Sequence, residues 1–258
     1  MHQQDPIIHI QHLHKHYASK EVLKGIDLEI YSGEVIGYIG PNGAGKSTTV
    51  KILTGLITDF EGSVTIDGND LRSDAMAIKS IMGYVPENAE LYDVLTPVEY
   101  LDFVGKLYGM EEGLIIERAT KLLTALGLAD QLHKRMDTFS KGMRQKVLLV
   151  SAIIHNPKIL ILDEPLSGLD ANAVITVKEL IARLAKEGKT IFYCSHMMDV
   201  VEKVSNRILL INEGAIVANG SFEQLKQEHG DSLEHIFTKL TGQDDATDSA
   251  SQIISAFE

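Results

Sequence analysis

The segment Gly40-Pro-Asn-Gly-Ala-Gly-Lys-Ser-Thr48 follows an apolar run, Val35–Ile39, and precedes a helical pattern that extends through Leu56. Its Gly-x-x-x-x-Gly-Lys-Ser spacing is typical of a phosphate-binding loop between a strand and a helix. Glycines let the chain curl until successive N–H groups point at phosphate oxygens, and the helix N-terminus adds partial positive charge. The residues expected to hold the phosphates are Asn42, Gly43, Ala44, Gly45, Lys46, Ser47 and Thr48. Lys46 should reach the β- and γ-phosphates, and Ser47 Oγ should bind Mg²⁺.

A second motif, Ile159-Leu-Ile-Leu-Asp-Glu-Pro165, places two carboxylates after four apolar residues. The apolar run predicts a central strand, and open α/β sheets bind ligands at the carboxyl ends of their strands. We expect Asp163 to hold Mg²⁺, and Glu164 to act on the attacking water as a general base or an orienting group.

Strands and helices alternate around these two motifs. Short strands broken by turns are expected at Ile7–Leu13, Ile26–Ile30, Val35–Ile39, Val64–Ile66 and Met82–Val85. Later strands are expected at Lys158–Leu162, Thr190–Cys194, Ile208–Ile211 and Ala215–Ala218, with a helix over Ala173–Ala185. Continuous apolar strands that alternate with helices predict an α/β fold with a mainly parallel sheet covered on both faces.

The middle of the chain has a different pattern. Thr96-Pro97-Val98-Glu99 is a capping box with proline at the first helical position, and apolar residues recur behind it at helical spacing. Further helices are expected around Leu114–Leu126 and Lys141–Ile154. We expect a helical block over about 88–156, inserted in a single domain over 1–240. Residues 241–258, which carry four acids and no Lys or Arg, are interpreted as a mobile tail.

Composition excludes several classes of function. Lys and Arg total 24 against 36 Asp and Glu, so the net charge of −12 argues against nucleic-acid coating or polybasic membrane binding. The single cysteine, Cys194, cannot form an internal disulfide. No apolar run approaches the roughly 18–20 residues of a spanning helix, and the N-terminus lacks a secretory pattern. These features predict a cytoplasmic protein without a membrane segment of its own.

Four motifs in order resemble one family: GPNGAGKST (Gly40–Thr48), ILDEP (Ile161–Pro165), SGLD (Ser167–Asp170) and CSH (Cys194–His196). Together they are similar to the nucleotide-binding subunit of an ATP-binding-cassette (ABC) transporter, over residues from about 7 to 240. The resemblance implies a P-loop NTPase cassette with a mainly parallel core sheet, an N-terminal antiparallel β part and an inserted helical subdomain. It also implies an ATPase in which two cassettes close head to tail around two ATP molecules.

The resemblance assigns further residues to the nucleotide site. Phe139-Ser-Lys-Gly-Met143 matches the family signature at Ser140 and Gly142, which would contact the ATP of the second cassette. Lys141 either adds a cation near that γ-phosphate or points to water. Asp170 belongs to the SGLD motif, and His196 matches a histidine that contacts the γ-phosphate. Tyr17 resembles the aromatic residue that stacks on adenine, although a half-buried tyrosine at a strand end is the alternative.

Two further features of the N-terminal half are a glutamate at a family position and a run of histidines. Glu87, in Tyr84-Val85-Pro86-Glu87, stands where the family usually has glutamine. A carboxylate oxygen is a good Mg²⁺ ligand, so we expect metal binding to persist, with like-charge repulsion raising a nearby carboxyl pKa. The alternating His9, His12, His14 and His16 are interpreted as solvated, because no carboxylate or cysteine in that run completes a metal site.

The expected partner is an integral membrane subunit. The resemblance implies a groove between the segment after Glu87 and the helix that begins at Thr96, with Asn88–Tyr92 lining it. Leu91 and Tyr92 either contact the docked helix there or are buried inside the subunit itself. Motif details, including SKGMRQK and Leu233–Gly242, look most like bacterial export-type (ABC-2-like) cassettes, which act peripherally on the inner face of the membrane. Soluble ABC ATPases of translation or DNA repair are the alternative, and a degenerate cassette is a third. One cassette per chain, and no room for a long coiled coil between Glu87 and Ser140, favour transport without nucleic acid.

Overall fold

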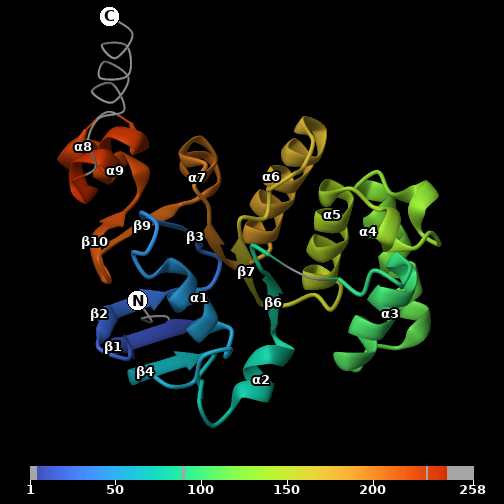
Figure 1. The fold of residues 1–258 in the computed structure, drawn as a ribbon, viewed down its shortest axis with the longest axis horizontal. Helices are drawn as coiled ribbons and strands as arrows, with labels where there is room; N and C mark the ends of the chain where they lie inside the picture. Colours follow the sequence, from blue (N-terminus) through green and yellow to red (C-terminus); the bar gives the residue numbers. More distant parts are fainter. Residues whose placement is uncertain (1–4, 89–90, 231, 243–258) are drawn as a thin grey trace, which may run out of the picture.

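The computed structural model describes residues 5–88, 91–230 and 232–242 (Figure 1). Two sheets, the helices that flank them and a lateral group of helices make up this part of the chain. Within it, no helix combines the length and the hydropathy needed to cross a membrane. Residues 243–258, most of the expected tail, lie outside the described residues.

The first sheet is antiparallel, with strand order β2-β1-β4-β5. Its strands are β1 (Ile8–Tyr17), β2 (Lys20–Ile30), β4 (Glu61–Ile66) and β5 (Asn69–Asp70). The sequence pattern underestimated β1 and β2, because the hairpin continues through polar residues such as His14, paired with Lys24, and His16, paired with Glu21. Backbone hydrogen bonding carries both strands to the turn, so Tyr17 lies at the end of β1.

The second sheet has the order β10-β9-β3-β8-β7-β6. Its strands are β3 (Val35–Ile39), β6 (Met82–Val85), β7 (Ile159–Asp163), β8 (Thr190–Cys194), β9 (Arg207–Asn212) and β10 (Ala215–Gly220). The pairing is parallel except between β9 and β10, which confirms the expected mainly parallel core. Alternate residues of β3 enter two different cores: Val35 and Ile39 belong to the core shared with the later helices, whereas Ile36 and Tyr38 face the antiparallel sheet.

Helices surround the second sheet. They are α1 (Lys46–Leu53), α2 (Ala75–Ser80), α6 (Ala171–Lys186), α7 (Met198–Val204), α8 (Phe222–His229) and α9 (Leu233–Thr241). Helix α1 ends three residues before the predicted Leu56, because Gly55 turns into the left-handed region with φ of 68°.

The helical group lies beyond β6 and α6 (Figure 1). It comprises α3 (Pro97–Leu107), α4 (Glu112–Ala125), two 3₁₀ turns (Ala129–Gln131 and Met136–Thr138) and α5 (Lys141–Ile153). The capping box at Thr96 is present as expected: Thr96 Oγ1 accepts from Glu99 N, and Glu99 Oε2 accepts from Thr96 N. A bidentate pair between Arg144 Nη1 and Asp93, at 2.9 and 2.7 Å, joins α5 to the segment before α3. The exact span of this block, about 88–156, stays a prediction.

Candidate nucleotide site

The loop after β3 has the backbone geometry that its glycines permit. Gly43 and Gly45 have φ of 80° and 115°, in the region that side-chain-bearing residues disfavour. Gly40 passes so close to the carbonyl of Ile211 that a Cβ would collide with it. Helix α1 begins at Lys46 directly behind Gly45. The loop is therefore a curled backbone at a helix N-terminus, the arrangement that suits an anion.

Lys46 extends along this loop. Its Nζ donates to the carbonyl oxygens of Gly40, at 2.6 Å, and Pro41, at 3.0 Å. Burial lowers the pKa of the Lys46 ammonium, against the attraction of nearby carboxylates such as Glu164 and Asp163. The cation is thus held at the loop, facing the end of β7.

Two carboxylates leave the carboxyl end of β7 side by side. Glu164 Oε2 accepts from Ser195 Oγ at 3.0 Å, and its Oε1 accepts from the backbone N–H of His196 at 2.7 Å. The His196 ring lies near the same oxygen, with Nε2 3.8 Å from Oε1. The segment after β8 therefore fixes the direction of the Glu164 carboxylate.

Asp163 lies in a strongly anionic environment. Burial, reinforced by the like charges of Glu87 and Glu164, raises the pKa of Asp163 to about 6. Such crowding of carboxylates is the arrangement that a divalent cation relieves. Asp163, Glu87 and the hydroxyl of Ser47 all line one cavity, so oxygen donors of the kind that Mg²⁺ prefers converge there.

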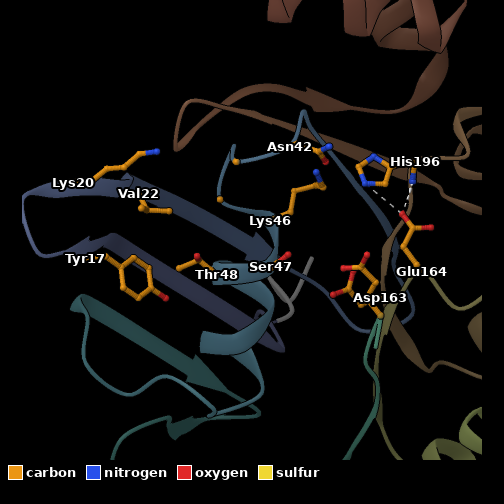
Figure 2. A pocket seen from close by; sticks show the side chains of 13 residues that line it. Tyr17, Lys20, Val22, Asn42, Lys46, Ser47, Thr48, Asp163, Glu164 and His196 are labelled. Carbon is orange, nitrogen blue, oxygen red and sulfur yellow. Dashed lines mark hydrogen bonds and ion pairs between the residues drawn. The ribbon is translucent and has the colours of Figure 1, made fainter. Parts of the chain in front are cut away.

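That cavity, of about 290 Å³, lies between the antiparallel hairpin, the loop and the end of β7 (Figure 2). Its lining contains Tyr17, Lys20, Val22, Asn42, Gly43, Gly45, Lys46, Ser47, Thr48, Glu87, Asp163, Glu164 and His196. Ala44, in the same loop, is buried and does not belong to this lining. The sequence reasoning missed Lys20 and Val22; β2 brings both to the cavity beside Tyr17, and the hairpin pairing was the signal that could have placed them.

Three expected site residues lie elsewhere in the same chain. Ser140 caps α5, where its Oγ accepts from Met143 N at 3.3 Å, and Gly142 follows it. Asp170 caps α6 through Ala173 N and accepts from Lys146 Nζ at 3.0 Å. None of the three belongs to the described lining of the cavity.

The N-terminal turn of α5 is attached to the loop after Glu164. Lys141 Nζ donates to Ser167 Oγ at 2.8 Å, and Gln145 Nε2 donates to Pro165 O at 3.0 Å. Gly142 approaches the Gly168 carbonyl so closely that a Cβ would collide. The sequence suggested that Lys141 either adds a cation near the partner's γ-phosphate or points to water, and neither alternative included a bond to Ser167. Only tertiary folding brings Ser167 next to Lys141.

The histidines of β1 lie beside carboxylates of neighbouring strands. His14 Nδ1 is 2.8 Å from Glu21 Oε1, and His12 Nδ1 is 3.3 Å from Asp27 Oδ2. Strand pairing supplies these carboxylates, since the run of residues 9–16 itself contains none. Even so, the described residues contain no group of three or more His, Cys, Asp or Glu that could hold a metal ion.

The fold and the cavity together define a P-loop nucleotide-binding protein. A family model described as ABC transporter matches residues 23–167. The chain therefore belongs to the ABC transporter family, as an ATP-binding subunit with ATPase function.

Curated relatives agree with this assignment. The chain is 35% identical to the linearmycin resistance ATP-binding protein LnrL of Bacillus subtilis (strain 168), over 83% of this chain and 69% of the relative. It is also 35% identical to the ABC transporter ATP-binding protein NatA of the same organism, over 84% of this chain and 89% of the relative.

Solved structures agree as well. An ATP-binding subunit of an ABC transporter superposes with a TM-score of 0.85 at 30% identity, covering 91% of this chain and 99% of that chain. A dimeric post-hydrolysis structure of the ATP-binding cassette MJ0796, bound to ADP and Pi, has a TM-score of 0.76 at 24% identity, over 83% of this chain and 98% of that chain. The second likeness shows a shared fold, and both confirm the ABC cassette architecture predicted from the sequence.

Proposed function

We propose that this subunit binds Mg·ATP in the cavity of Figure 2 and hydrolyses it to drive transport through a separate membrane subunit. The observation that carries this proposal is the convergence of the glycine loop, Lys46 and the two carboxylates of β7 on one cavity. The loop N–H groups and Lys46 would bind the phosphates. Tyr17 would stack on the adenine, with Val22 adding an apolar contact beside it.

Magnesium would be held by Ser47, Asp163 and Glu87. When bound, the ion neutralises phosphate charge and polarises the γ-phosphoryl group. Glu164 would orient the attacking water and accept its proton, while Ser195 Oγ and the His196 N–H hold the carboxylate in place. The His196 side chain, which is exposed at the cavity, would contact the γ-phosphate.

We propose that a second cassette completes the site. Ser140 is exposed and Gly142 partly exposed at the N-terminus of α5, and neither lines the cavity of their own chain, as expected for residues that act on a partner's ATP. The partner is a second copy or a homologue, joined head to tail in the ATP-bound state. Asp170 would contribute at the same interface, from the loop to which α5 is attached.

A membrane subunit would dock beside α3. Tyr92, Leu95 and Phe103 line a small hollow, and the side chains of Tyr92 and Phe103 are 61% and 44% exposed. Their rings meet edge to face at 5.9 Å between centroids. Leu91, expected in the groove, is 8% exposed and packs inward. Residues 89–90 of the expected lining lie outside the described residues.

Transport in the direction of export, and a location on the inner face of the membrane, are part of the same proposal. Similarity to a resistance ATP-binding protein supports export. The alternative of a soluble ABC ATPase for translation or DNA repair is less favoured, because the family match and the relatives reported above are transporter proteins or ABC ATP-binding proteins.

The substitution Glu164→Gln tests the catalytic assignment. It keeps the side-chain length and the hydrogen-bond acceptor but removes the base, so we expect turnover to fall by about 10²-fold or more while ATP binding persists. With ATP, size-exclusion chromatography should show a lasting dimer, since the γ-phosphate is no longer removed. Full ATPase turnover in the variant would refute the role of Glu164.

A further inference from the structure

The ring of Tyr17 has a buried cation against it. Lys15 lies two residues earlier on β1, and its Nζ is 4.9 Å from the centre of the Tyr17 ring. Lys15 is 6% exposed, whereas Tyr17 is 46% exposed and belongs to the described cavity lining, which does not include Lys15. The ammonium therefore lies over one face of the ring, and the part of the ring that stays exposed, its open face, borders the cavity.

Burial of the Lys15 ammonium costs desolvation free energy. A charged group loses its hydration in the protein interior and needs a compensating partner. Asp59 Oδ2 accepts from Lys15 Nζ at 3.0 Å, but the Asp59 side chain is 99% exposed. A carboxylate in full solvent compensates weakly because water screens it. The electron-rich face of Tyr17 supplies a second compensating contact.

We propose that Lys15 is a positioning residue for base recognition: its ammonium holds the Tyr17 ring in place as a platform and polarises it toward a stacked purine. A cation behind the ring draws π-electron density away from the open face, which lessens repulsion of a second π system stacked there. It also restricts the ring before the ligand arrives, so less conformational entropy is lost on binding. The inference rests on the proposed stacking of Tyr17 on adenine.

The test compares two ligands that share the phosphates and differ in the base. Affinities of the full-length protein for Mg·ATP and for magnesium tripolyphosphate are measured by isothermal titration calorimetry. The variants are Lys15→Met, which keeps the length and removes the charge, Lys15→Arg, which restores a cation, and Tyr17→Ala. We expect Lys15→Met to weaken ATP binding by about three- to tenfold, in line with a partly desolvated cation–π contact. Tripolyphosphate affinity should change less than about twofold, since it has no base to stack.

Two further results are expected. Lys15→Arg should restore most of the ATP affinity, and the double variant Lys15→Met/Tyr17→Ala should bind ATP no more weakly than Tyr17→Ala, because the lysine acts through the ring. Lys15→Met leaves no buried unpaired charge, because the Asp59 side chain is 99% exposed, and thermal unfolding provides the check on folding.

Contrary results distinguish a failure of the Lys15 role from a failure of the proposed base site at Tyr17. Equal weakening of both ligands by Lys15→Met, or unchanged ATP affinity, would overturn the role of Lys15 while leaving Tyr17 as the platform. If Tyr17→Ala leaves ATP binding unchanged, the proposed base site itself is wrong, and the inference about Lys15 falls with it.

Discussion

Glu164 holds its backbone in a conformation that a residue with a side chain disfavours. Its φ of 48° lies in the left-handed region, where a residue with a Cβ is strained. The turn is fixed by the bond from Glu164 N to the Cys194 carbonyl, at 2.9 Å, and by the two bonds that its carboxylate accepts from Ser195 and His196. The conformation directs the carboxylate toward the segment that follows β8, at the edge of the cavity.

Glu87 is the departure from the family pattern with the clearest electrostatic consequence. It contributes to the raised pKa of Asp163, second only to burial. We expect Glu87→Gln to remove one anionic oxygen from the metal environment and to raise the Mg²⁺ concentration for half-maximal ATPase by about two- to fivefold. The acid limb of the pH profile should move to lower pH, because one like charge near Asp163 is gone. ATPase assays across Mg²⁺ concentration and pH measure both effects.

The matched control is Glu117→Gln, which removes an exposed carboxylate on α4 outside the cavity. Its Mg²⁺ and pH dependences should equal those of the unmodified protein. If Glu87→Gln behaves like this control, Glu87 does not contact the metal.

At the scale of elements, the edge strand β6 is attached to the helical group at one carbonyl. Met82 O is 3.1 Å from His155 Nε2, just beyond α5, and 3.4 Å from Tyr108 Oη at the end of α3. The Tyr108 and His155 rings stack with centroids 3.6 Å apart and planes inclined by 6°. Because a carbonyl can only accept, His155 carries its proton on Nε2, and Nδ1 is left buried with no partner among the described residues.

This geometry predicts a pH-dependent stability. Burial lowers the pKa of His155 to about 4 from 6.5, since protonation would place a second, unpaired N–H inside the protein. Between these values the unfolded chain binds the proton and the folded chain does not, so stability is complete above pH 6.5 and is lost as the pH falls toward 4. A difference of about 2.5 in pKa, at about 1.36 kcal/mol for each pKa unit, sets an upper bound of about 3 kcal/mol on the loss, and solvent screening at this partly buried ring makes it smaller.

Urea unfolding of the nucleotide-free protein between pH 4.5 and 7.5, followed by circular dichroism, measures this slope. His155→Gln should flatten it, and His133→Gln, at an exposed histidine, should leave it as it was. An unchanged slope in His155→Gln would assign the acid sensitivity to other groups.

At the scale of the whole molecule, the nucleotide cavity and the hollow beside α3 lie on different parts of the structure. They are joined through α5, whose N-terminal turn is attached to the loop after Glu164 by the bonds from Lys141 and Gln145. Arg144 on the same helix is paired with Asp93, next to Tyr92. A displacement of α5 on ATP binding would therefore reach both the loop after Glu164 and the proposed docking surface.

The docking surface can be tested through the partner. Phe103→Asp places a charge in the apolar hollow, where a docked helix would have to desolvate it. We expect affinity capture from detergent-solubilised membranes to lose a multi-span membrane protein by at least about tenfold, the effect of a buried unpaired charge at an interface. Ile175→Asp, at a 66% exposed apolar position on α6, is the control and should retain the partner. Equal recovery with both variants would place the docking surface elsewhere.

The sequence by itself determined the family and the α/β class, and it located the glycine loop before α1 and the two acids at the end of β7. Each of these depends on residues close together in the chain: glycines at fixed spacing before a helix, or two acids at the end of an apolar strand. It also placed the capping box at Thr96, because a cap is a contact over three residues.

Tertiary structure decided the contacts that cross between elements. The hairpin register brought Lys20 and Val22 into the cavity and carboxylates beside the β1 histidines. Folding of α5 onto the loop after Glu164 paired Lys141 with Ser167, 26 residues away. The side chain of Leu91 packs inward, whereas Tyr92 is exposed and contacts Phe103 on the surface. None of these pairs is set by spacing along the chain, because their distances depend on strand register and helix packing, which the whole core fixes at once.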